Sequence, residues 1–301
     1  MEWINDLCSL AEMGQPIAEP TPVSGGLLHR MYALETETGK YAVKLLNPEI
    51  MRRPDVFDNY RRAEALEALL EARGLPILPA LAIRGMKMLH LGERYAYLFP
   101  WYDGRVIRGA AVTPQHAAAI GRTLAGMHAV AQRERPDLPE PLYIDWDALL
   151  PACPELLPHR DLLAALTDKS NEAQQKLPPL QAICHNDLDT KNILWLGSGH
   201  RVIDLETLDF SSPFAELLET ALYWSGIEEH ALDTARFEAL ISAYRAAGGE
   251  LPQDWGLLLD SDQGRLGWLA YVLEQGDAAQ ARETMARILC AQDIRPWLLQ
   301  L

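Results

Sequence analysis

The spacing of apolar residues changes along the chain, from strand-like alternation before residue 100 to helical periodicity after residue 113. In the first part, short alternating runs are separated by turn residues such as Thr-Gly-Lys and Gly-Glu-Arg, which predicts strands at 29–35, 40–47, 79–84 and 95–99. The segment 56–73 is instead predicted to be a helix. Gly74 and Pro76 follow it and prevent its continuation. Residues 1–99 are therefore predicted to form a small lobe of strands with one helix.

The second part of the chain is predicted to be mainly helical. Thr113 is a good N-cap and Pro114 suits the first helical position, so a helix should run from 113 to about 132. The stretch 133–158 is rich in proline and is predicted to be irregular. Further helices are expected at 159–176, 214–225, 230–247, 254–275 and 279–291. The predicted organisation is an N-terminal lobe at 1–99, a hinge at 100–104 and a C-terminal lobe at 105–301.

Two apolar strands interrupt this helical region between residues 183 and 204. A loop that carries Asp187 and Asn192 precedes the first of these strands, and a short turn leads to the second, which ends in Asp204. This order can aim three oxygen-bearing side chains at one point. Phosphoryl transfer needs such a set, because a carboxylate orients the attacking hydroxyl and further oxygens bind the Mg²⁺ of a nucleotide. We therefore predict Asp187 as the base, and Asn192 and Asp204 as metal ligands.

Bulk composition limits the classes of partner. The 301 residues carry 27 basic and 42 acidic side chains, a net charge of −15, which argues against general nucleic-acid binding. No apolar run is long enough to span a bilayer, and the first residues lack the features of a signal peptide. The four cysteines are scattered without the spacing of a zinc site, so we expect reduced thiols in a cytoplasmic protein.

The loop pattern His185-x-Asp187-x-x-x-x-Asn192 resembles the catalytic loop of protein-kinase-like enzymes. Upstream, Tyr41-Ala-Val-Lys44-Leu-Leu is similar to their lysine-bearing strand, and a Ser24-Gly25-Gly26 turn precedes it. The second metal segment is Asp204-Leu-Glu206, and only a short connection separates it from the next predicted helix. In these features the chain looks like the aminoglycoside phosphotransferase and choline kinase branch of that superfamily.

The resemblance implies a two-lobed α+β fold, MgATP or MgGTP as phosphoryl donor, and a small-molecule hydroxyl as acceptor. Lys44 would contact the nucleotide phosphates and pair with Glu64, with Glu67 as the rival candidate. Backbone at Ser24, Gly25 and Gly26 would approach the phosphates closely. The purine base of the nucleotide would lie in an apolar slot and form hydrogen bonds with backbone groups of the hinge. The residues expected in the slot are Ala42, Leu194 and Ile203, and the expected backbone groups are the carbonyl of Pro100 and the amide of Tyr102.

The chemical class of the acceptor is predicted from the composition of the C-terminal region. Acidic and aromatic residues of the C-terminal region suit a cationic acceptor, such as an aminoglycoside or a choline-like amine. Candidate acceptor contacts are Asp189, Glu206, Trp224, Glu228, Glu229 and Glu274. Homoserine or a neutral sugar are alternative acceptors. A catalytically silent nucleotide-binding sensor is the alternative from a different functional class, which the presence of Lys44, Asp187, Asn192 and Asp204 disfavours.

Overall fold

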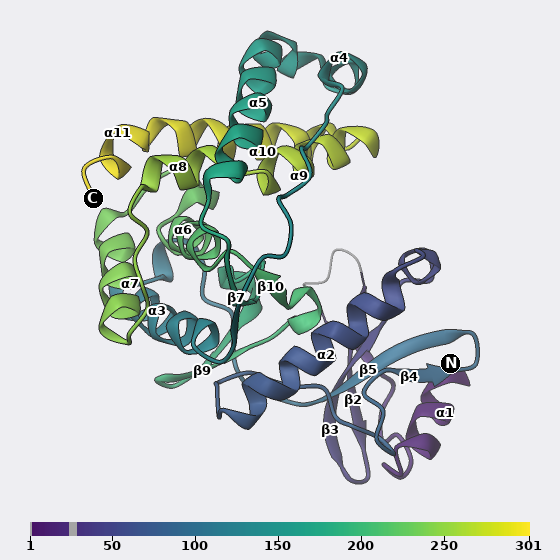
Figure 1. Ribbon diagram of the computed structural model, residues 1–301. Helices are drawn as coiled ribbons and strands as arrows, with labels where there is room; N and C mark the ends of the chain where they lie inside the picture. The colour runs from purple at the N-terminus through teal and green to yellow at the C-terminus, as the bar shows by residue number, and fades with distance from the viewer. Residues whose placement is uncertain (1, 24–28) are drawn as a thin grey trace. The chain divides into compact units, whose positions relative to one another are not determined.

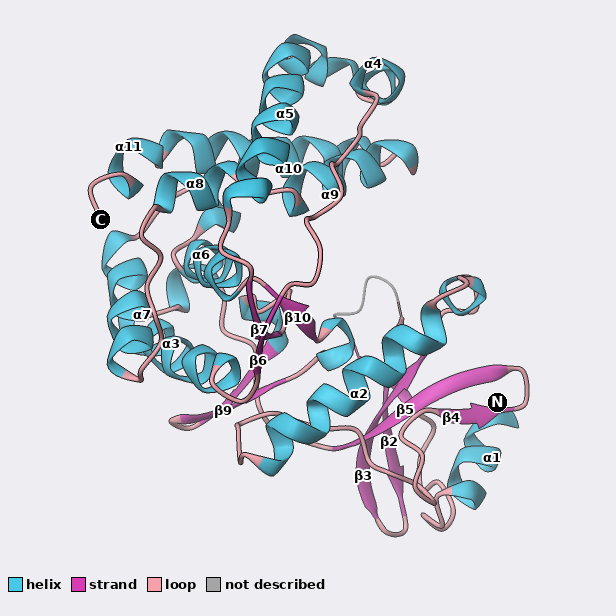
Figure 2. Cartoon of the chain, viewed as in Figure 1, coloured by secondary structure: helices cyan, strands magenta, loops and turns pink. Residues whose placement is uncertain are grey.

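The computed structural model describes residues 2–23 and 29–301. Two compact units emerge from it: unit 1 comprises Met1–Ile107 and Thr190–Asp209, and unit 2 comprises Arg108–Asp189 and Phe210–Leu301. The predicted α+β class is confirmed, since antiparallel strands dominate unit 1 and helices dominate unit 2 (Figure 2). No helix within the described residues is both long and apolar enough to cross a membrane.

Unit 1 contains a five-stranded antiparallel sheet in the order β1-β2-β3-β5-β4. Its strands are β1 (Thr21–Val23), β2 (Arg30–Thr36), β3 (Gly39–Leu45), β4 (Leu89–Leu91) and β5 (Arg94–Pro100). Two helices belong to this unit, α1 (Glu2–Leu10) and α2 (Val56–Ala72), and α2 lies along the sheet in Figure 1. A hairpin of β8 (Ile193–Leu196) and β9 (Gly199–Val202) completes it.

Alternation along β3 decides which side chains face each helix. Val43 and Leu45 pack into one buried cluster with Ile4 and Leu7 of α1. Lys44 therefore points to the opposite face, where Tyr60 of α2 and Tyr97 of β5 form a second buried cluster. The register pairs Lys44 directly with Tyr97. Strand alternation thus directs Lys44 to the face of the sheet opposite Val43 and Leu45.

The predicted lobe boundaries differ from the compact units in two respects. The expected hinge at 100–104 lies within unit 1, because Arg105 and Trp195 exchange two backbone hydrogen bonds of 2.9 Å. Val202 also donates to the carbonyl of Pro76 and accepts from the amide of Leu78. These long-range bonds tie the β8–β9 hairpin to unit 1, although it lies far along the chain in the predicted C-terminal lobe.

Unit 2 is built mainly of helices. They are α3 (Pro114–His128), α4 (Trp146–Leu149), α5 (Arg160–Lys176), α6 (Pro213–Trp224), α7 (Thr234–Ala246), α8 (Trp255–Asp260), α9 (Gly264–Glu274), α10 (Ala278–Asp293) and α11 (Arg295–Leu298). A small sheet has the order β10-β7-β6, with β6 (Gln132–Glu134), β7 (Leu180–Cys184) and β10 (Asp209–Ser211). Helix α3 begins as predicted, with Thr113 capping the amide of His116.

Short 3₁₀ helices connect several of these elements. They lie at Ile50–Arg52, Gly109–Ala111, Leu150–Ala152, Pro154–His159, Thr190–Asn192, Leu205–Thr207 and Ile227–Glu229. The predicted irregular stretch 133–158 is in fact partly ordered, since β6, α4 and two of these turns lie in it. Trp146, Leu150, Cys153 and Leu156 from this stretch are buried against α9 and α10, and that burial offsets its many prolines.

Several predicted elements are wrong, each for a local reason. Helix α1 was missed, although Ile4, Leu7 and Cys8 share one buried face. No strand spans 79–84; the short strand β4 lies later, and Pro79 has no amide to donate to a ladder. The single helix expected at 254–275 is interrupted, because the Ser261 hydroxyl bonds back to Leu258 and Asp262 accepts from the amide of Arg265.

Helices α3 and α7 pack closely because α3 carries a glycine at their contact. A Cβ atom on Gly121 would lie 2.2 Å from the carbonyl oxygen of Leu240 on α7. Such a distance is far below van der Waals contact, so any side chain at this position would force the helices apart. The close approach brings together Tyr244 of α7 and His128 of α3, whose hydroxyl and Nδ1 atoms lie 2.8 Å apart.

We expect Gly121→Ala to lower the free energy of unfolding by at least about 1 kcal/mol, since overpacking outweighs the gain in helix propensity. Gly267→Ala on α9 is the matched control, because no atom lies within 4 Å of the added Cβ. The control should gain about 1 kcal/mol from helix propensity alone. Urea unfolding of both variants measures the difference, and equal stabilisation by both would contradict the close packing of α3 on α7.

Candidate active site

The ammonium group of Lys44 lies at the middle of a cluster of charged side chains in unit 1. Its Nζ atom lies 2.5 Å from Oδ1 of Asp204 and 2.5 Å from Oε2 of Glu206. The side chain is almost fully buried, and burial opposes its charge, but the two carboxylates outweigh that effect and raise the pKa of Lys44. Lys44 is therefore a fixed cation. Such a group can bind a phosphate oxygen without first having to gain a proton.

His29 extends this cluster on the side of Glu206. Its Nδ1 atom accepts the backbone N–H of Asn47 at 3.0 Å, so Nε2 carries the hydrogen in the neutral ring. Nε2 lies 3.2 Å from Oε1 of Glu206 and 3.2 Å from the hydroxyl of Tyr60. Burial pushes the pKa of Glu206 upward, yet His29 and Lys44 together hold it down at about 2. Glu206 is thus paired with both His29 and Lys44, and its role as an acceptor contact stays a prediction.

A cavity of about 450 Å³ opens beside this cluster within unit 1. Its polar lining comes from His29, Arg53, Asp55, Asn59, Glu206 and Thr207. This volume is in the range typical of small-molecule pockets. The charged cluster therefore adjoins a space that a small ligand can enter.

Asn192 and Asp204 are brought together by the β8–β9 hairpin. The backbone carbonyl of Asn192 accepts the amide of Ile203 at 2.9 Å, so Asp204 follows directly after the residue that pairs with Asn192. Asp204 has a left-handed backbone with φ 63° and ψ 52°, which ends the extended run at this position. Left-handed backbone is unusual for a residue other than glycine and concentrates at functional sites. An amide oxygen and a carboxylate are suitable ligands for Mg²⁺, so this donor set fits the predicted metal.

The predicted pairing of Lys44 with Glu64 is wrong. Among the described residues, Glu64 accepts a hydrogen bond of 2.7 Å from the hydroxyl of Tyr97. The rival candidate, Glu67, is buried and pairs with Lys87 while also accepting the amide of Ala80. Glu64 and Glu67 of α2 therefore bond other residues of unit 1, and the carboxylates that pair with Lys44 come from the segment after β9. Sequence spacing could not distinguish carboxylates on α2 from carboxylates that lie 160 and 162 residues away.

The residues expected around a nucleotide base share unit 1. Ala42, Leu194 and Ile203 are half-buried, whereas their strand neighbours Val43, Ile193 and Val202 are fully buried. A Cβ on Gly104 would lie 2.8 Å from Leu194, so the chain after β5 passes directly over that side chain. The amide of Trp101 donates to Lys40 on β3. Because a trans peptide directs its N–H and C=O oppositely, the carbonyl of Pro100 faces away from β3.

These positions are compatible with the predicted slot for the nucleotide base, and the binding of a nucleotide there stays a prediction. Tyr102 also lies in this segment, and the guanidinium of Arg201 on β9 lies 5.7 Å from its ring centre. Ser24, Gly25 and Gly26 fall outside the described residues.

The predicted base, Asp187, lies in unit 2 on a loop that buried groups hold in place. Asn186 has a positive φ of 63°, and its backbone N–H donates to Oε1 of Glu216 at 2.7 Å. Its side-chain oxygen accepts the hydroxyl of Ser211 at 2.5 Å. The indole N–H of Trp224 donates to the carbonyl of Leu188 at 3.0 Å. Helix α6 therefore holds the loop on both sides of Asp187.

Two further residues support this loop. Glu216 of α6 accepts the amide of Asn186, directly before Asp187. Cys184 is fully buried at the end of β7, on the strand that enters the loop. His128 was missed: its Nε2 atom lies 2.8 Å from Oε2 of Glu216. A histidine within the apolar stretch of a predicted helix was the available signal.

Most predicted acceptor contacts are engaged elsewhere or buried. Trp224 is fully buried, and its indole belongs to the support of the loop, so its prediction as an acceptor contact is wrong. Glu228 pairs with Arg287 at 3.5 Å. Asp189 is 1% exposed. Glu229 and Glu274 are exposed on the surface of unit 2 and remain predictions.

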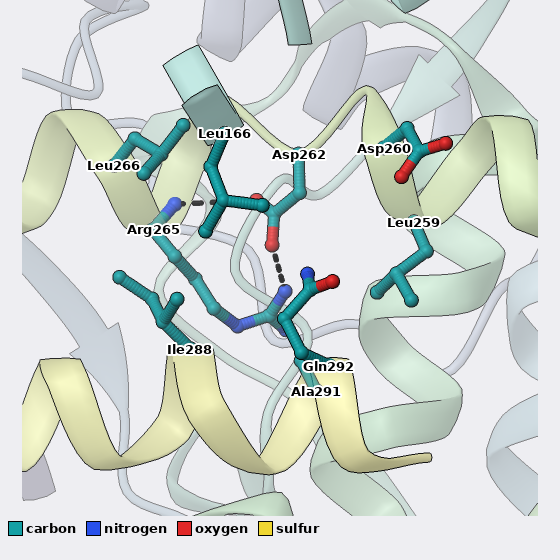
Figure 3. A pocket seen from close by; sticks show the side chains of 9 residues that line it. All are labelled: Leu166, Leu259, Asp260, Asp262, Arg265, Leu266, Ile288, Ala291 and Gln292. Atoms are coloured by element: carbon teal, nitrogen blue, oxygen red, sulfur yellow. Dashed lines mark hydrogen bonds and ion pairs between the residues drawn. The ribbon is translucent and has the colours of Figure 1, made fainter. Parts of the chain in front are cut away.

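Asp260, at the end of α8, and Asp262, between α8 and α9, are also paired with basic side chains. Figure 3 shows Arg265 directed at Asp262. Both residues line a small cavity of about 20 Å³, on the order of one water molecule. Asp260 pairs with Lys169 at 2.8 Å and with the guanidinium of Arg295. The cavity is too small for an acceptor, and its charges are paired. This part of unit 2 is therefore structural.

Glu219 is the exception among these carboxylates. It lies on α6 three residues after Glu216, half-buried, and it makes no hydrogen bond or ion pair with any residue that the structure describes. Burial raises its pKa to about 7. Arg265 opposes that shift, and the negative charges of Asp262, Glu216 and, least of the three, Asp187 add to it. A positive group placed beside Glu219 would therefore be stabilised.

Comparison with sequence profiles of known families matches residues 19–256 to the phosphotransferase enzyme family. The match spans well over half of the chain, which therefore belongs to this family and is a phosphotransferase. No curated protein sequence matches the chain.

Solved structures of similar fold include three kinases of small molecules. A microcompartment-associated aminopropanol kinase has TM-score 0.66 and 16% identity, covering 98% of this chain and 98% of that one. An amicoumacin kinase in complex with AMP-PNP and Ca²⁺ has TM-score 0.67 and 13% identity, covering 95% and 92%. A spectinomycin phosphotransferase in complex with ADP and spectinomycin has TM-score 0.65 and 13% identity, covering 96% and 91%. At these identities the likeness establishes the fold.

We expect Glu219→Gln to stabilise the protein at pH 8 and to have little effect at pH 5. The pKa of Glu219 is about 7 in the folded chain and 4.5 in its ordinary state. Its ionisation therefore lowers the free energy of unfolding, and this loss begins above pH 4.5 and is complete above pH 7. Relief of that cost should contribute roughly 1–3 kcal/mol at pH 8.

Urea unfolding at both pH values measures this effect. Glu274→Gln is the matched control, because Glu274 is exposed on α9, and it should change neither midpoint. Equal effects of Glu219→Gln at pH 5 and pH 8 would show that Glu219 is not desolvated in the folded protein.

Proposed function

We propose that this phosphotransferase transfers the γ-phosphoryl group of MgATP or MgGTP to a hydroxyl of a small, cationic acceptor. The observation that carries the nucleotide part is the buried ammonium of Lys44, fixed 2.5 Å from the predicted metal ligand Asp204. A desolvated cation beside a carboxylate is the arrangement that binds phosphates together with their metal. Membership of the phosphotransferase enzyme family supports the same reaction.

Each predicted residue has one role in this proposal. The acceptor oxygen attacks the γ-phosphorus, the bond to the β-phosphate oxygen breaks, and Asp187 receives the proton of the acceptor hydroxyl. Lys44 neutralises phosphate oxygens. Asn192 and Asp204 would hold Mg²⁺, which when bound supplies charge neutralisation to the phosphates. Ala42, Leu194, Ile203, the carbonyl of Pro100 and the amide of Tyr102 would bind the nucleotide base.

The cationic character of the acceptor rests on unit 2. Glu219 is a half-buried carboxylate that lacks an ion pair among the described residues and lies in electrostatic range of Asp187. The names of two similar structures, an aminopropanol kinase and an ethanolamine kinase from Plasmodium vivax, point to hydroxyl compounds that carry an amine. An amino alcohol or an aminoglycoside is accordingly the first class of acceptor to test, ahead of homoserine and neutral sugars.

Nucleotide binding is tested by thermal shift. MgATP or MgGTP should raise the unfolding temperature of the wild type, and Lys44→Ala should abolish most of that rise. The variant loses the cation that faces the phosphates and leaves Asp204 and Glu206 without their shared partner. Lys40→Ala on the same strand is the control, because Lys40 lies over Trp101 and near Glu35 on the surface. No stabilisation of the wild type by either nucleotide would refute the proposal.

Turnover is tested by release of ADP or GDP against a panel of amino alcohols, aminoglycosides, homoserine and sugars. Asp187→Asn should lower kcat by about 10²–10⁴ while nucleotide affinity is retained, because the amide cannot accept the proton. Near-normal turnover of this variant would show that another group is the base. High turnover with a neutral acceptor only would remove the cationic part and leave the transfer itself. Nucleotide binding with no turnover on any acceptor would favour the sensor alternative.

A further inference from the structure

A chain of buried hydrogen bonds connects helix α7 with the loop that carries Asp187. The hydroxyl of Tyr244 lies 2.8 Å from Nδ1 of His128 on α3, and Nε2 of that ring lies 2.8 Å from Oε2 of Glu216 on α6. The other oxygen of Glu216 accepts the backbone N–H of Asn186 at 2.7 Å. The three side chains are at most 4% exposed, so water does not compete for these bonds.

The direction of each bond follows from the chemistry of the groups. Burial raises the pKa of Glu216, but the hydrogen bonds from His128 and Asn186 outweigh it, so Glu216 remains a carboxylate that can only accept. Nε2 of His128 must then carry a hydrogen. In the neutral ring Nδ1 is left as an acceptor, and the hydroxyl of Tyr244 donates to it. Glu216 thereby fixes the tautomer, and Tyr244 helps to fix the orientation of the His128 ring from its other nitrogen.

His128, Cys184 and Glu216 also place three potential metal-binding atoms within 4.8 Å of one another. Their bonding argues against a metal. The Nε2 hydrogen of His128 faces Glu216, and the thiol of Cys184 lies 3.5 Å from the carbonyl oxygen of Ser211. Burial raises the pKa of Cys184 well above its ordinary value, so the sulfur keeps its proton. The cluster is a hydrogen-bond network.

The network ends on a strained residue. Asn186 has φ 63°, a conformation that costs free energy in any residue other than glycine, and it directly precedes Asp187. A residue in this conformation keeps it only when its surroundings determine it. The bond from the Asn186 amide to Glu216 is one such determinant, and a shift of that amide would redirect the carboxylate of Asp187.

We propose that Tyr244 is a positioning residue for phosphoryl transfer, acting through His128 and Glu216 on the backbone of Asn186. The inference rests on the proposed function for its consequence in turnover, but its structural part concerns unit 2 alone. The close contact of α3 with α7 at Gly121 makes the Tyr244–His128 bond possible, since it allows the two helices to approach. A hydroxyl remote from any ligand contact should then influence kcat and leave substrate affinity unchanged.

The first test is Tyr244→Phe, which keeps the ring and removes only the hydroxyl. We expect kcat to fall roughly 3- to 10-fold, the change that one neutral hydrogen bond can exert, with KM for both substrates unchanged. Phe237→Leu is the matched control for stability, because Phe237 is a buried residue of α7 that packs on Trp255 and Trp297 instead. It should lower the unfolding temperature by a few degrees without lowering kcat.

The second test is a mutant cycle. In a His128→Ala background, Tyr244→Phe should cause no further loss of kcat, because the bond through which it acts is already gone. Independent losses that multiply would overturn the proposal. An equal fall of kcat in Tyr244→Phe and Phe237→Leu would do the same.

Hydrogen exchange separates failure of this inference from failure of the proposed function. Tyr244→Phe should accelerate exchange of the Asn186 amide about 10-fold and leave the amides of β3 unchanged, whether or not an acceptor has been found. Unaltered exchange at Asn186 would overturn the inference. A wild type that transfers no phosphoryl group, together with accelerated exchange in the variant, would refute the proposed function and retain the network.

Discussion

The buried carboxylate of Glu216 is the constraint on which the loop around Asp187 in unit 2 depends. An ionised group removed from water is costly unless every oxygen finds a donor, and Glu216 finds one on α3 and one on the loop before Asp187. Those two bonds join elements that are far apart in sequence and leave them little freedom. Breaking one bond would leave a buried charge partly unsatisfied. The cost of burying one carboxylate therefore fixes the loop at Asn186, and the bond from Trp224 to Leu188 holds it on the other side of Asp187.

Compensation of a buried charge also organises unit 1, where the buried group is a cation instead of an anion. Lys44 is a buried cation, and two carboxylates that follow β9 supply its compensation. This pairing links the central strand of the sheet to the segment carrying the predicted metal ligand. Charge compensation thus places the residues of proposed chemistry in both units.

Paired charges limit what the acidic surface can do. The sequence shows many acidic residues after position 206, and the structure shows that several of them neutralise arginine or lysine within unit 2. Glu219 differs because it is partly desolvated and lacks an ion pair among the described residues. A net charge of −15 is therefore a poor guide to the acceptor, and one carboxylate near the predicted base is a better one.

The sequence by itself determined the fold class, most long helices, and the order of the chemical residues. Periodicity and caps identified α2, α3, α5, α6 and α10 to within a few residues, because these are local properties of the chain. The motif around Asp187 and Asn192 indicated phosphoryl transfer for the same reason: its spacing is local. Short elements such as α1 and β4 were missed, since their local signals are weak.

Tertiary structure alone decided the partners. Lys44 pairs with Asp204 and Glu206 instead of Glu64, and the β8–β9 hairpin belongs with unit 1, because long-range hydrogen bonds and charge compensation set both. His128 and Tyr244 carry no motif and gain their role only where α3, α6 and α7 meet. Spacing along a chain records which residues are neighbours in an element. It does not record which buried charge a distant residue will satisfy, and that is fixed only when the chain packs.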